Sequence, residues 1–214
     1  NCINSGLRRI YVLTQYKSIS MQRHLRQGWN IFNSELNEYI DVIPAQQRIG
    51  FDWYKGTADA IFQNIYTIEQ EKPQEVLVLA GDHIYKMDYS KMILAHRERQ
   101  ADVTVGVVEM QKDKAQHLGV IEVDETGVIW GFHEKSKNPP TLPNNPTMVY
   151  ASMGIYVFNR EILEKEVTED AKTNSEHDFG KNIMPQMIDK KRQIVIYNLK
   201  ENGMENNPYW KDVG

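Results

Sequence analysis

The chain has 214 residues, 41% of them hydrophobic, and a formal net charge of −4. This composition is typical of a globular protein with an apolar core, and it provides no basic field for nucleic acid or for an anionic membrane surface. The one cysteine, Cys2, excludes an internal disulfide and a cysteine-based zinc site, which fits a cytoplasmic protein. Apolar runs such as Val76–Ala80 are far shorter than the roughly 20 residues of a membrane-spanning helix.

The first half of the chain alternates short β-rich runs with helical stretches. Strands are expected at Arg9–Thr14, Val42–Ala45, Glu75–Ala80 and Val103–Glu109. Helices are expected between them, at Ile19–Trp29, Thr57–Lys72 and Tyr89–Gln100, with Thr57 as the N-cap of the second. Such alternation is typical of βαβ units, so the sequence predicts an α/β protein with a mostly parallel sheet covered by helices.

The second half carries hairpin and turn signals. Leu118–Val123 and Val128–Glu134 are predicted to form a hairpin whose turn places Gly127 at positive φ. Four prolines between residues 139 and 146 predict a loop, because proline fits neither a helix interior nor a central strand. Beyond it we expect strands at Ser152–Asn159 and Gln193–Leu199, helices at Arg160–Glu169 and His177–Lys190, and a loop at Lys200–Pro208. No linker is visible, so residues 1–214 are assigned to part of one domain.

The most informative segment is the apolar run Val76–Ala80, which Gly81 and Asp82 follow. A continuous apolar run is typical of a strand buried on both faces, and ligands of open α/β sheets bind at the carboxyl ends of such strands. Asp82 offers a hard oxygen ligand for Mg²⁺, and Gly81 lets the backbone approach a ligand closely. The alternative is that Asp82 only caps the next turn.

Two other segments carry weaker signals. Gly56 and Thr57 precede a helix whose free N–H groups would suit a phosphate or a base edge, although ordinary capped helices begin in the same way. Glu134 and Lys135 end a hairpin strand, where a lysine can hold a phosphate and a carboxylate can bind sugar hydroxyls. Most such pairs are simply solvated.

Asp178 and Asp212 are open to two interpretations. Asp178 can be a ligand-binding residue or only an N-cap, and the aromatic beside Asp212 can be only a core residue. His83, His177, Glu134 and Asp178 lack the local spacing of a zinc site, and neither a Walker A nor a GxGxxG string is present. Local patterns alone therefore leave the chemistry undecided.

Six motifs occur in one order along the chain. They are WYKGTADA from residue 53, VLVLAGDHIYKMDY from 76, FHEK from 132, ASMGIYVF from 151, HDFGKNIMPQMI from 177 and PYWKDVG from 208. Their order and approximate spacing resemble the bacterial ADP-glucose pyrophosphorylases. NCINSGLRRIYVLTQY from residue 1 and IPAQQR from residue 43 extend the resemblance to essentially the whole chain. It implies a nucleotide-diphospho-sugar transferase fold with a Rossmann-like mixed sheet, and synthesis of ADP-glucose and pyrophosphate from ATP and glucose 1-phosphate.

The resemblance also implies roles for the candidate residues. Asp82 and Asp212 match the carboxylates that bind Mg²⁺ in the family, and Lys135 matches the lysine that holds the phosphate of glucose 1-phosphate. The other residues of the sugar-phosphate pocket would be Tyr54, Gly119, Glu134, Ser152, Tyr156, Asp178 and Trp210. The nucleotide side of the cleft would include Gln15, Gly56 and Thr57.

The chain departs from the family pattern in two respects. The glycine-rich nucleotide loop of the family is expected before Asn1 and its β-helix after Gly214, so we expect the 214-residue chain alone to make little ADP-glucose. Ser136 stands where related enzymes often have proline. The resemblance further implies an allosteric homotetramer that works in bacterial glycogen synthesis.

Three rival functions are open on the sequence. A pyrophosphorylase that uses UTP or dTTP would share the fold and the metal site. A regulatory or nucleotide-sugar-binding subunit without catalysis would not need Asp82, Lys135 and Asp212 together. A structural interaction domain would leave the polar residues at the strand ends unexplained.

Overall fold

The structure, a computed structural model, describes residues 1–16, 18–45, 53–203 and 209–213. Four parts of the predicted segments lie outside the described residues: positions 46–48 of IPAQQR, the end of the predicted loop at 204–208, Pro208 at the start of PYWKDVG, and Gly214. Within the described ranges, none of the helices combines the length and the apolarity needed to cross a membrane.

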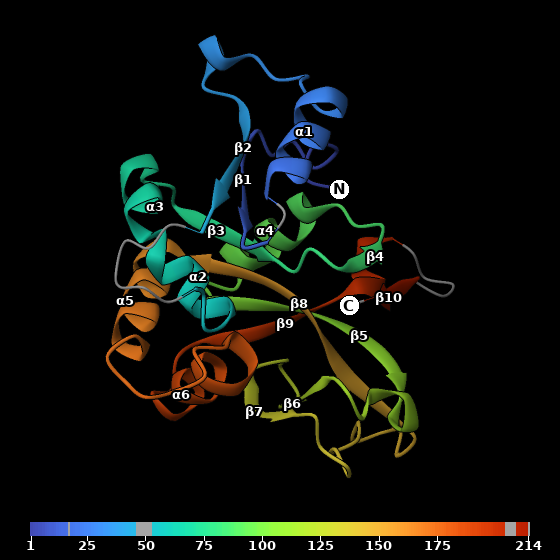
Figure 1. Cartoon of the computed structure of the whole chain (residues 1–214). Coiled ribbons are helices and arrows are strands. Elements are labelled where there is room, and N and C mark those ends of the chain that lie inside the picture. Colours follow the sequence, from blue (N-terminus) through green and yellow to red (C-terminus); the bar gives the residue numbers. More distant parts are fainter. Residues whose placement is uncertain (17, 46–52, 204–208, 214) are drawn as a thin grey trace.

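A six-stranded sheet lies at the centre of the molecule (Figure 1). Its strands are β3 (Glu75–Leu79), β5 (Val103–Gln111), β6 (Gly119–Val123), β7 (Ile129–Glu134), β8 (Met148–Asn159) and β9 (Ile194–Asn198). They follow the order β7-β6-β8-β5-β9, and β3 pairs with the C-terminal half of β8. The predicted hairpin is confirmed, because β6 and β7 are antiparallel and Gly127 has φ of 79°.

The predicted α/β class with a mixed sheet is confirmed. In this sheet β3, β5, β6 and β9 share one direction, whereas β7 and β8 run the other way. Because β8 lies antiparallel between β3 and β5, the one adjacent parallel pair among its described strands is β5–β9. Four of the six strands therefore run in the same direction, but most neighbouring strands pair antiparallel. β8 also begins at Met148, earlier than the predicted Ser152, because its first residues pair with the end of β5.

A second, two-stranded sheet contains β1 (Arg9–Thr14) and β2 (Tyr39–Pro44), joined through α1 (Ser18–Gly28). These two strands are parallel, and Figure 1 shows the βαβ unit projecting from the central sheet. The bounds of β1 are as predicted. β2 begins before the predicted Val42, because Tyr39 pairs in register with Arg9.

The predicted helix Thr57–Lys72 is two helices, α2 (Thr57–Gln63) and α3 (Ile65–Glu71). The break falls at Asn64, whose Nδ2 donates to the Ala60 carbonyl (2.8 Å) and to the Tyr54 hydroxyl (2.9 Å). Asparagine side chains compete in this way with the hydrogen bonds of a helix backbone.

The remaining predicted helices are α4 (Tyr89–Glu98), α5 (Arg160–Asp170) and α6 (Met184–Asp189). A π-helical turn, η3 (Phe179–Ile183), precedes α6, so the predicted helix His177–Lys190 is irregular in its first turn. The predicted loop at Lys200 opens with a 3-10 turn, Leu199–Asn202. Two short strands were not predicted: β4 (His83–Tyr85) and β10 (Trp210–Asp212), which pair antiparallel.

The central sheet buries apolar side chains on both faces, as its apolar sequences predicted. Tyr156 and Phe158 of β8 belong to a core that includes residues of α2, α5 and α6. Ile155 and Val157 of the same strand belong to a second core, with Met92 of α4. Side chains alternate between the faces of a strand, so one strand contributes to both cores and helices cover both sides.

Candidate active site

The two carboxylates predicted to share a metal lie together. Asp82 follows β3 and precedes β4, and Asp212 ends β10 opposite His83. The N–H of Val213 donates to the Asp82 carbonyl at 3.0 Å, which fastens the two segments. The ligand atoms of Asp82, His83 and Asp212 all lie within 4.8 Å of one another. Hard oxygen atoms at this separation suit one divalent cation.

His83 belongs to this group, although the sequence predictions did not include it. Its Nε2 is 3.5 Å from Asp82 Oδ1 and 3.9 Å from Asp212 Oδ2, and its Nδ1 is buried without a hydrogen-bond partner among the described residues. A buried N–H without an acceptor is unfavourable, so we assign the hydrogen to Nε2, facing the carboxylates. In this tautomer the Nε2 hydrogen of His83 points toward Asp82 and Asp212.

Gly154 of β8 provides the space for the His83 ring. Its φ is +63°, and a Cβ at this position would lie 3.2 Å from His83 Cε1. The strand bulges here, because the pairing of β8 with β5 shifts between Tyr156 and Ser152. The bulge therefore brings the backbone of β8 against the His83 ring.

We expect Gly154→Ala to lower the free energy of unfolding by about 1–2 kcal/mol, since the left-handed region costs a residue with a Cβ about that much. Urea denaturation measures the change. Gly28→Ala is the control, because nothing lies within 4 Å of a Cβ there and no positive φ is required. Equal stabilities of the Gly154→Ala and wild-type proteins would contradict the assigned bulge.

A second cluster of polar side chains, here called the Glu134 group, contains Glu134 and Asp178 and lies around Gly119 and Gly180. Gly119 pairs with Glu134 across the hairpin, and a Cβ on Gly119 would lie 2.9 Å from Glu134 Oε2. A Cβ on Gly180 would lie 3.0 Å from the same oxygen and 3.5 Å from Asp178 Oδ1. The two glycines thus leave room for two carboxylates from distant segments, and the structure brings together Gly119, Glu134 and Asp178 as predicted.

The carboxylates of this group are in different electrostatic environments. Burial raises the pKa of Glu134, and Asp178 adds to the rise, while Lys135 and Lys181 oppose it. Asp178 Oδ1 accepts the N–H groups of Gly180 (2.9 Å) and Lys181 (3.1 Å). The capping alternative for Asp178 is therefore confirmed, and its binding role stays a prediction.

We expect Glu134→Gln to raise the free energy of unfolding at neutral pH. A carboxyl with a raised pKa in the folded state holds its proton more tightly there than in the unfolded chain, so its ionisation opposes folding above the ordinary value of 4.5. The gain should therefore vanish as the pH falls below this value. Urea unfolding over a pH series tests this, with the exposed Glu125→Gln as control. A gain that persisted in acid would contradict the stated cause.

Ser152 and Tyr156 lie on β8, which runs past both polar groups. Burial raises the pKa of Tyr156, a hydrogen bond with Ser152 opposes the rise, and Asp178 and Glu134 add to it. The Tyr156 ring also stacks on Phe179, with centroids 5.4 Å apart. Because Gly154 lies between Ser152 and Tyr156 and contacts His83, one strand links the two groups.

Lys135 and Trp210 each lie beside one of the two clusters. Lys135 is exposed at the end of β7, with φ of 50°, and its N–H donates to the Leu118 carbonyl at 3.1 Å. Trp210 packs edge-on against His83, with ring centroids 5.2 Å apart. Trp210 thus lies beside the cluster of Asp82, His83 and Asp212, and Lys135 follows Glu134 directly in the chain.

Comparison with known proteins identifies the family. A family model described as nucleotidyl transferase matches residues 1–214. The chain belongs to the nucleotidyl transferase family. It is 48% identical to glucose-1-phosphate adenylyltransferase 2 of Vibrio parahaemolyticus, and 46% and 47% identical to the glucose-1-phosphate adenylyltransferases of Koribacter versatilis and Methylococcus capsulatus. Each match covers 100% of this chain and 54%, 52% and 50% of the relative, so the chain spans about half the length of these relatives.

The start of α2 differs from the prediction. Gly56 is the N-cap in place of Thr57, and the N–H groups of Ala58 and Asp59 donate to the His177 carbonyl at 2.8 and 3.3 Å. These groups are therefore not free to bind a phosphate. The reason is close packing, because a Cβ on Gly56 would lie 2.3 Å from the His177 carbonyl oxygen.

The other residues predicted beside the substrates have separate surroundings. The Tyr54 hydroxyl accepts a hydrogen bond from Asn64. Gln15 follows β1 and is half-buried, and the ring of the next residue, Tyr16, lies 5.4 Å from that of Trp53. Their predicted contacts with substrate stay predictions.

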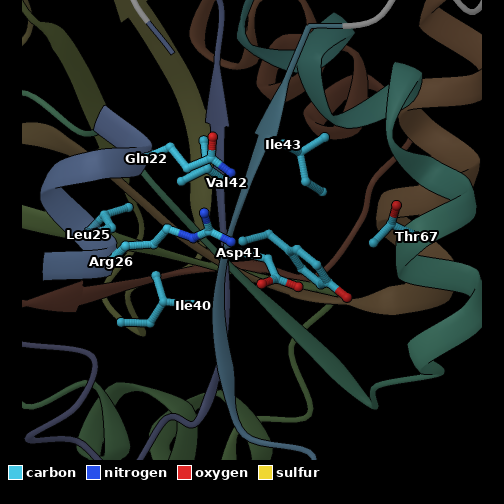
Figure 2. Close-up of a pocket in the computed structure, with 9 residues that line it drawn as sticks. Gln22, Leu25, Arg26, Ile40, Asp41, Val42, Ile43 and Thr67 are labelled. Carbon is cyan, nitrogen blue, oxygen red and sulfur yellow. The ribbon is translucent and has the colours of Figure 1, made fainter. Parts of the chain in front are cut away.

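A pocket of about 360 Å³ lies between the β1–β2 unit and α3 (Figure 2). Figure 2 shows Arg26 extending from α1 across the hollow toward β2. The full lining is Tyr11, Gln22, Leu25, Arg26, Ile40, Asp41, Val42, Ile43 and Thr67. It contains none of the predicted site residues, so the candidate active site is defined by convergent polar side chains and not by this pocket.

Proposed function

We propose that the protein carrying this chain is a glucose-1-phosphate adenylyltransferase, which makes ADP-glucose and pyrophosphate from ATP and glucose 1-phosphate. The observation that supports it most is the convergence of Asp82 and Asp212 after β3, with Glu134 and Asp178 lying together near Tyr156 of β8. The names of the relatives support the same reaction.

Asp82 and Asp212 fit Mg²⁺ by their chemistry. Both offer carboxylate oxygens, both side chains are exposed, and their ligand atoms lie within 4.8 Å of one another. Exposure leaves room for the waters and substrate phosphates that Mg²⁺ keeps in its coordination shell. When bound there, Mg²⁺ would offset the negative charge of the triphosphate and of the leaving pyrophosphate.

The side chains of the second group would position the sugar phosphate. Lys135 offers its ammonium to the phosphate, while Glu134 and Asp178 offer oxygens to glucose hydroxyls. A phosphate oxygen of glucose 1-phosphate then forms a bond to the α-phosphorus of ATP. The bond from this phosphorus to the bridging oxygen breaks, and pyrophosphate leaves with the electron pair. Alignment and charge neutralisation are sufficient for this displacement, so no covalent nucleophile is required.

The proposal includes the setting of the enzyme. The chain would be part of one catalytic domain in a cytoplasmic, allosteric homotetramer of bacterial glycogen synthesis. The resemblance of the motifs supports this setting. The net charge of −4 provides no basic field for nucleic acid or an anionic membrane, so substrate phosphates would have to be neutralised locally.

The test is turnover of the full-length protein with ATP, UTP and dTTP in separate reactions. With glucose 1-phosphate and Mg²⁺ present, ATP should give the highest kcat/KM for pyrophosphate release, and omission of the sugar phosphate should abolish it. Preference for UTP or dTTP would contradict the assigned nucleotide. Binding of ADP-glucose without any turnover would indicate a regulatory subunit.

A further inference from the structure

A buried histidine–aspartate pair includes His177, the residue that precedes Asp178 in the sequence. Asp170, at the end of α5, is 1% exposed, and His177 is 7% exposed. His177 Nδ1 lies 2.7 Å from Asp170 Oδ2, and the Ser175 hydroxyl donates to Asp170 Oδ1 at 2.8 Å. We assign the ring hydrogen to Nδ1, so that His177 donates it to Asp170.

The pair holds His177 in an uncommon backbone conformation. Its φ is 53°, in the left-handed region that residues other than glycine rarely adopt. The His177 N–H donates to the Ser175 hydroxyl at 3.0 Å, and its carbonyl accepts the N–H groups of Ala58 and Asp59. His177 therefore joins the end of α5 to the beginning of α2, and Figure 1 shows these two helices on the same side of the sheet.

This junction determines the position of the next residue, Asp178. One oxygen of the Asp178 carboxylate accepts the two N–H groups at the start of η3, and the other accepts the Thr57 hydroxyl at 3.0 Å. The Thr57 hydroxyl in turn accepts the Phe179 N–H at 3.1 Å. The bond between Asp178 Oδ2 and Thr57 thus depends on the relative placement of α2 and η3, which the His177 backbone connects.

We propose that Asp170 and His177 are positioning residues that orient Asp178, and through it the Glu134 group, for a sugar phosphate. Well-packed apolar residues of the same volume can stabilise a buried site as much as a polar pair does, so stability alone gives a weak reason for this arrangement. A need to orient Asp178 gives a specific reason for the pair. The inference rests on the proposed function, because it takes glucose 1-phosphate as the ligand of this group.

The test compares His177→Leu and His177→Asn in the full-length protein. Leucine removes the bond to Asp170, whereas the Asn Nδ2 occupies the place of the imidazole Nδ1, can donate to Asp170, and tolerates positive φ. Calorimetry should show glucose 1-phosphate binding weakened about tenfold in His177→Leu and largely restored in His177→Asn, as expected for one charge-assisted hydrogen bond. The KM for ATP should stay near that of the wild type.

His96→Leu is the matched control. His96 is also buried, at 1% exposure, and bonds Thr104 (2.8 Å) and Asn159 (3.2 Å) away from the site. The His96→Leu variant should have a lower melting temperature, as His177→Leu should, and should bind the sugar phosphate as the wild type does. If His177→Leu fails to fold, Asp170→Asn serves instead. Asp170→Asn keeps the volume of the side chain, but its amide nitrogen cannot accept a hydrogen bond, so binding should weaken several-fold.

The outcomes separate this inference from the proposed function. Wild-type affinity in His177→Leu and Asp170→Asn, or equal weakening by His96→Leu, would overturn the positioning role. Failure of His177→Asn to restore binding would do the same. A wild-type protein that binds glucose 1-phosphate but releases no pyrophosphate would contradict the proposed function, and the ranking of the variants by dissociation constant would still decide the positioning role.

Discussion

Asp82→Asn is expected to lower kcat of the full-length protein by about a hundredfold or more, with a smaller effect on the KM for glucose 1-phosphate. The reason is that one carboxylate charge is lost from the proposed Mg²⁺ site, where charge is most important in the transition state. The side chain keeps its size, so the hydrogen bond from Val213 to the Asp82 carbonyl should persist. Steady-state kinetics at saturating ATP measure the effect.

The control for this variant is Asp189→Asn. Asp189 is exposed at the end of α6, and the same change of charge there should leave kcat within about twofold of the wild type. A kcat for Asp82→Asn close to the wild-type value would contradict the metal role. It would support the alternative that Asp82 only caps its turn.

Lys135→Ala is expected to raise the KM for glucose 1-phosphate by about ten- to a hundredfold and to change kcat little. A hydrogen bond from an ammonium to a phosphate contributes about 1.5–3 kcal/mol, and this contact exists in the ground state as well as in the transition state. Lys137→Ala is the matched control, because Lys137 is exposed two residues further along the loop. A fall in kcat without a rise in KM would mean that the roles of Lys135 and Asp82 are exchanged.

The sequence predicted those parts of the fold in which local patterns decide the structure. The bounds of β1 and the start of β3 are as predicted, because apolar period and flanking turns mark them. Pairing was less predictable, since hydrogen bonding between distant strands places β8 antiparallel between β3 and β5. The short strands β4 and β10 were missed, because three residues are too few to show a period.

The candidate site was predictable where a residue type has few chemical uses. The structure brings Asp82 near Asp212, and Glu134 near Asp178, as the motifs implied. Contacts between distant segments were not predictable. The expected free N–H groups after Gly56 are instead bonded by the His177 carbonyl, which comes from far along the chain.

The most direct test of the shared metal site is a double-mutant cycle on Asp82 and Asp212. Asp82→Asn, Asp212→Asn and the double variant are compared with the wild type by kcat for pyrophosphate release at saturating ATP, glucose 1-phosphate and Mg²⁺. If the two carboxylates hold one ion, either single change removes most of its benefit, and the double variant should be little slower than the slower single variant. Losses that multiply would show that Asp82 and Asp212 act independently, and would contradict the shared site.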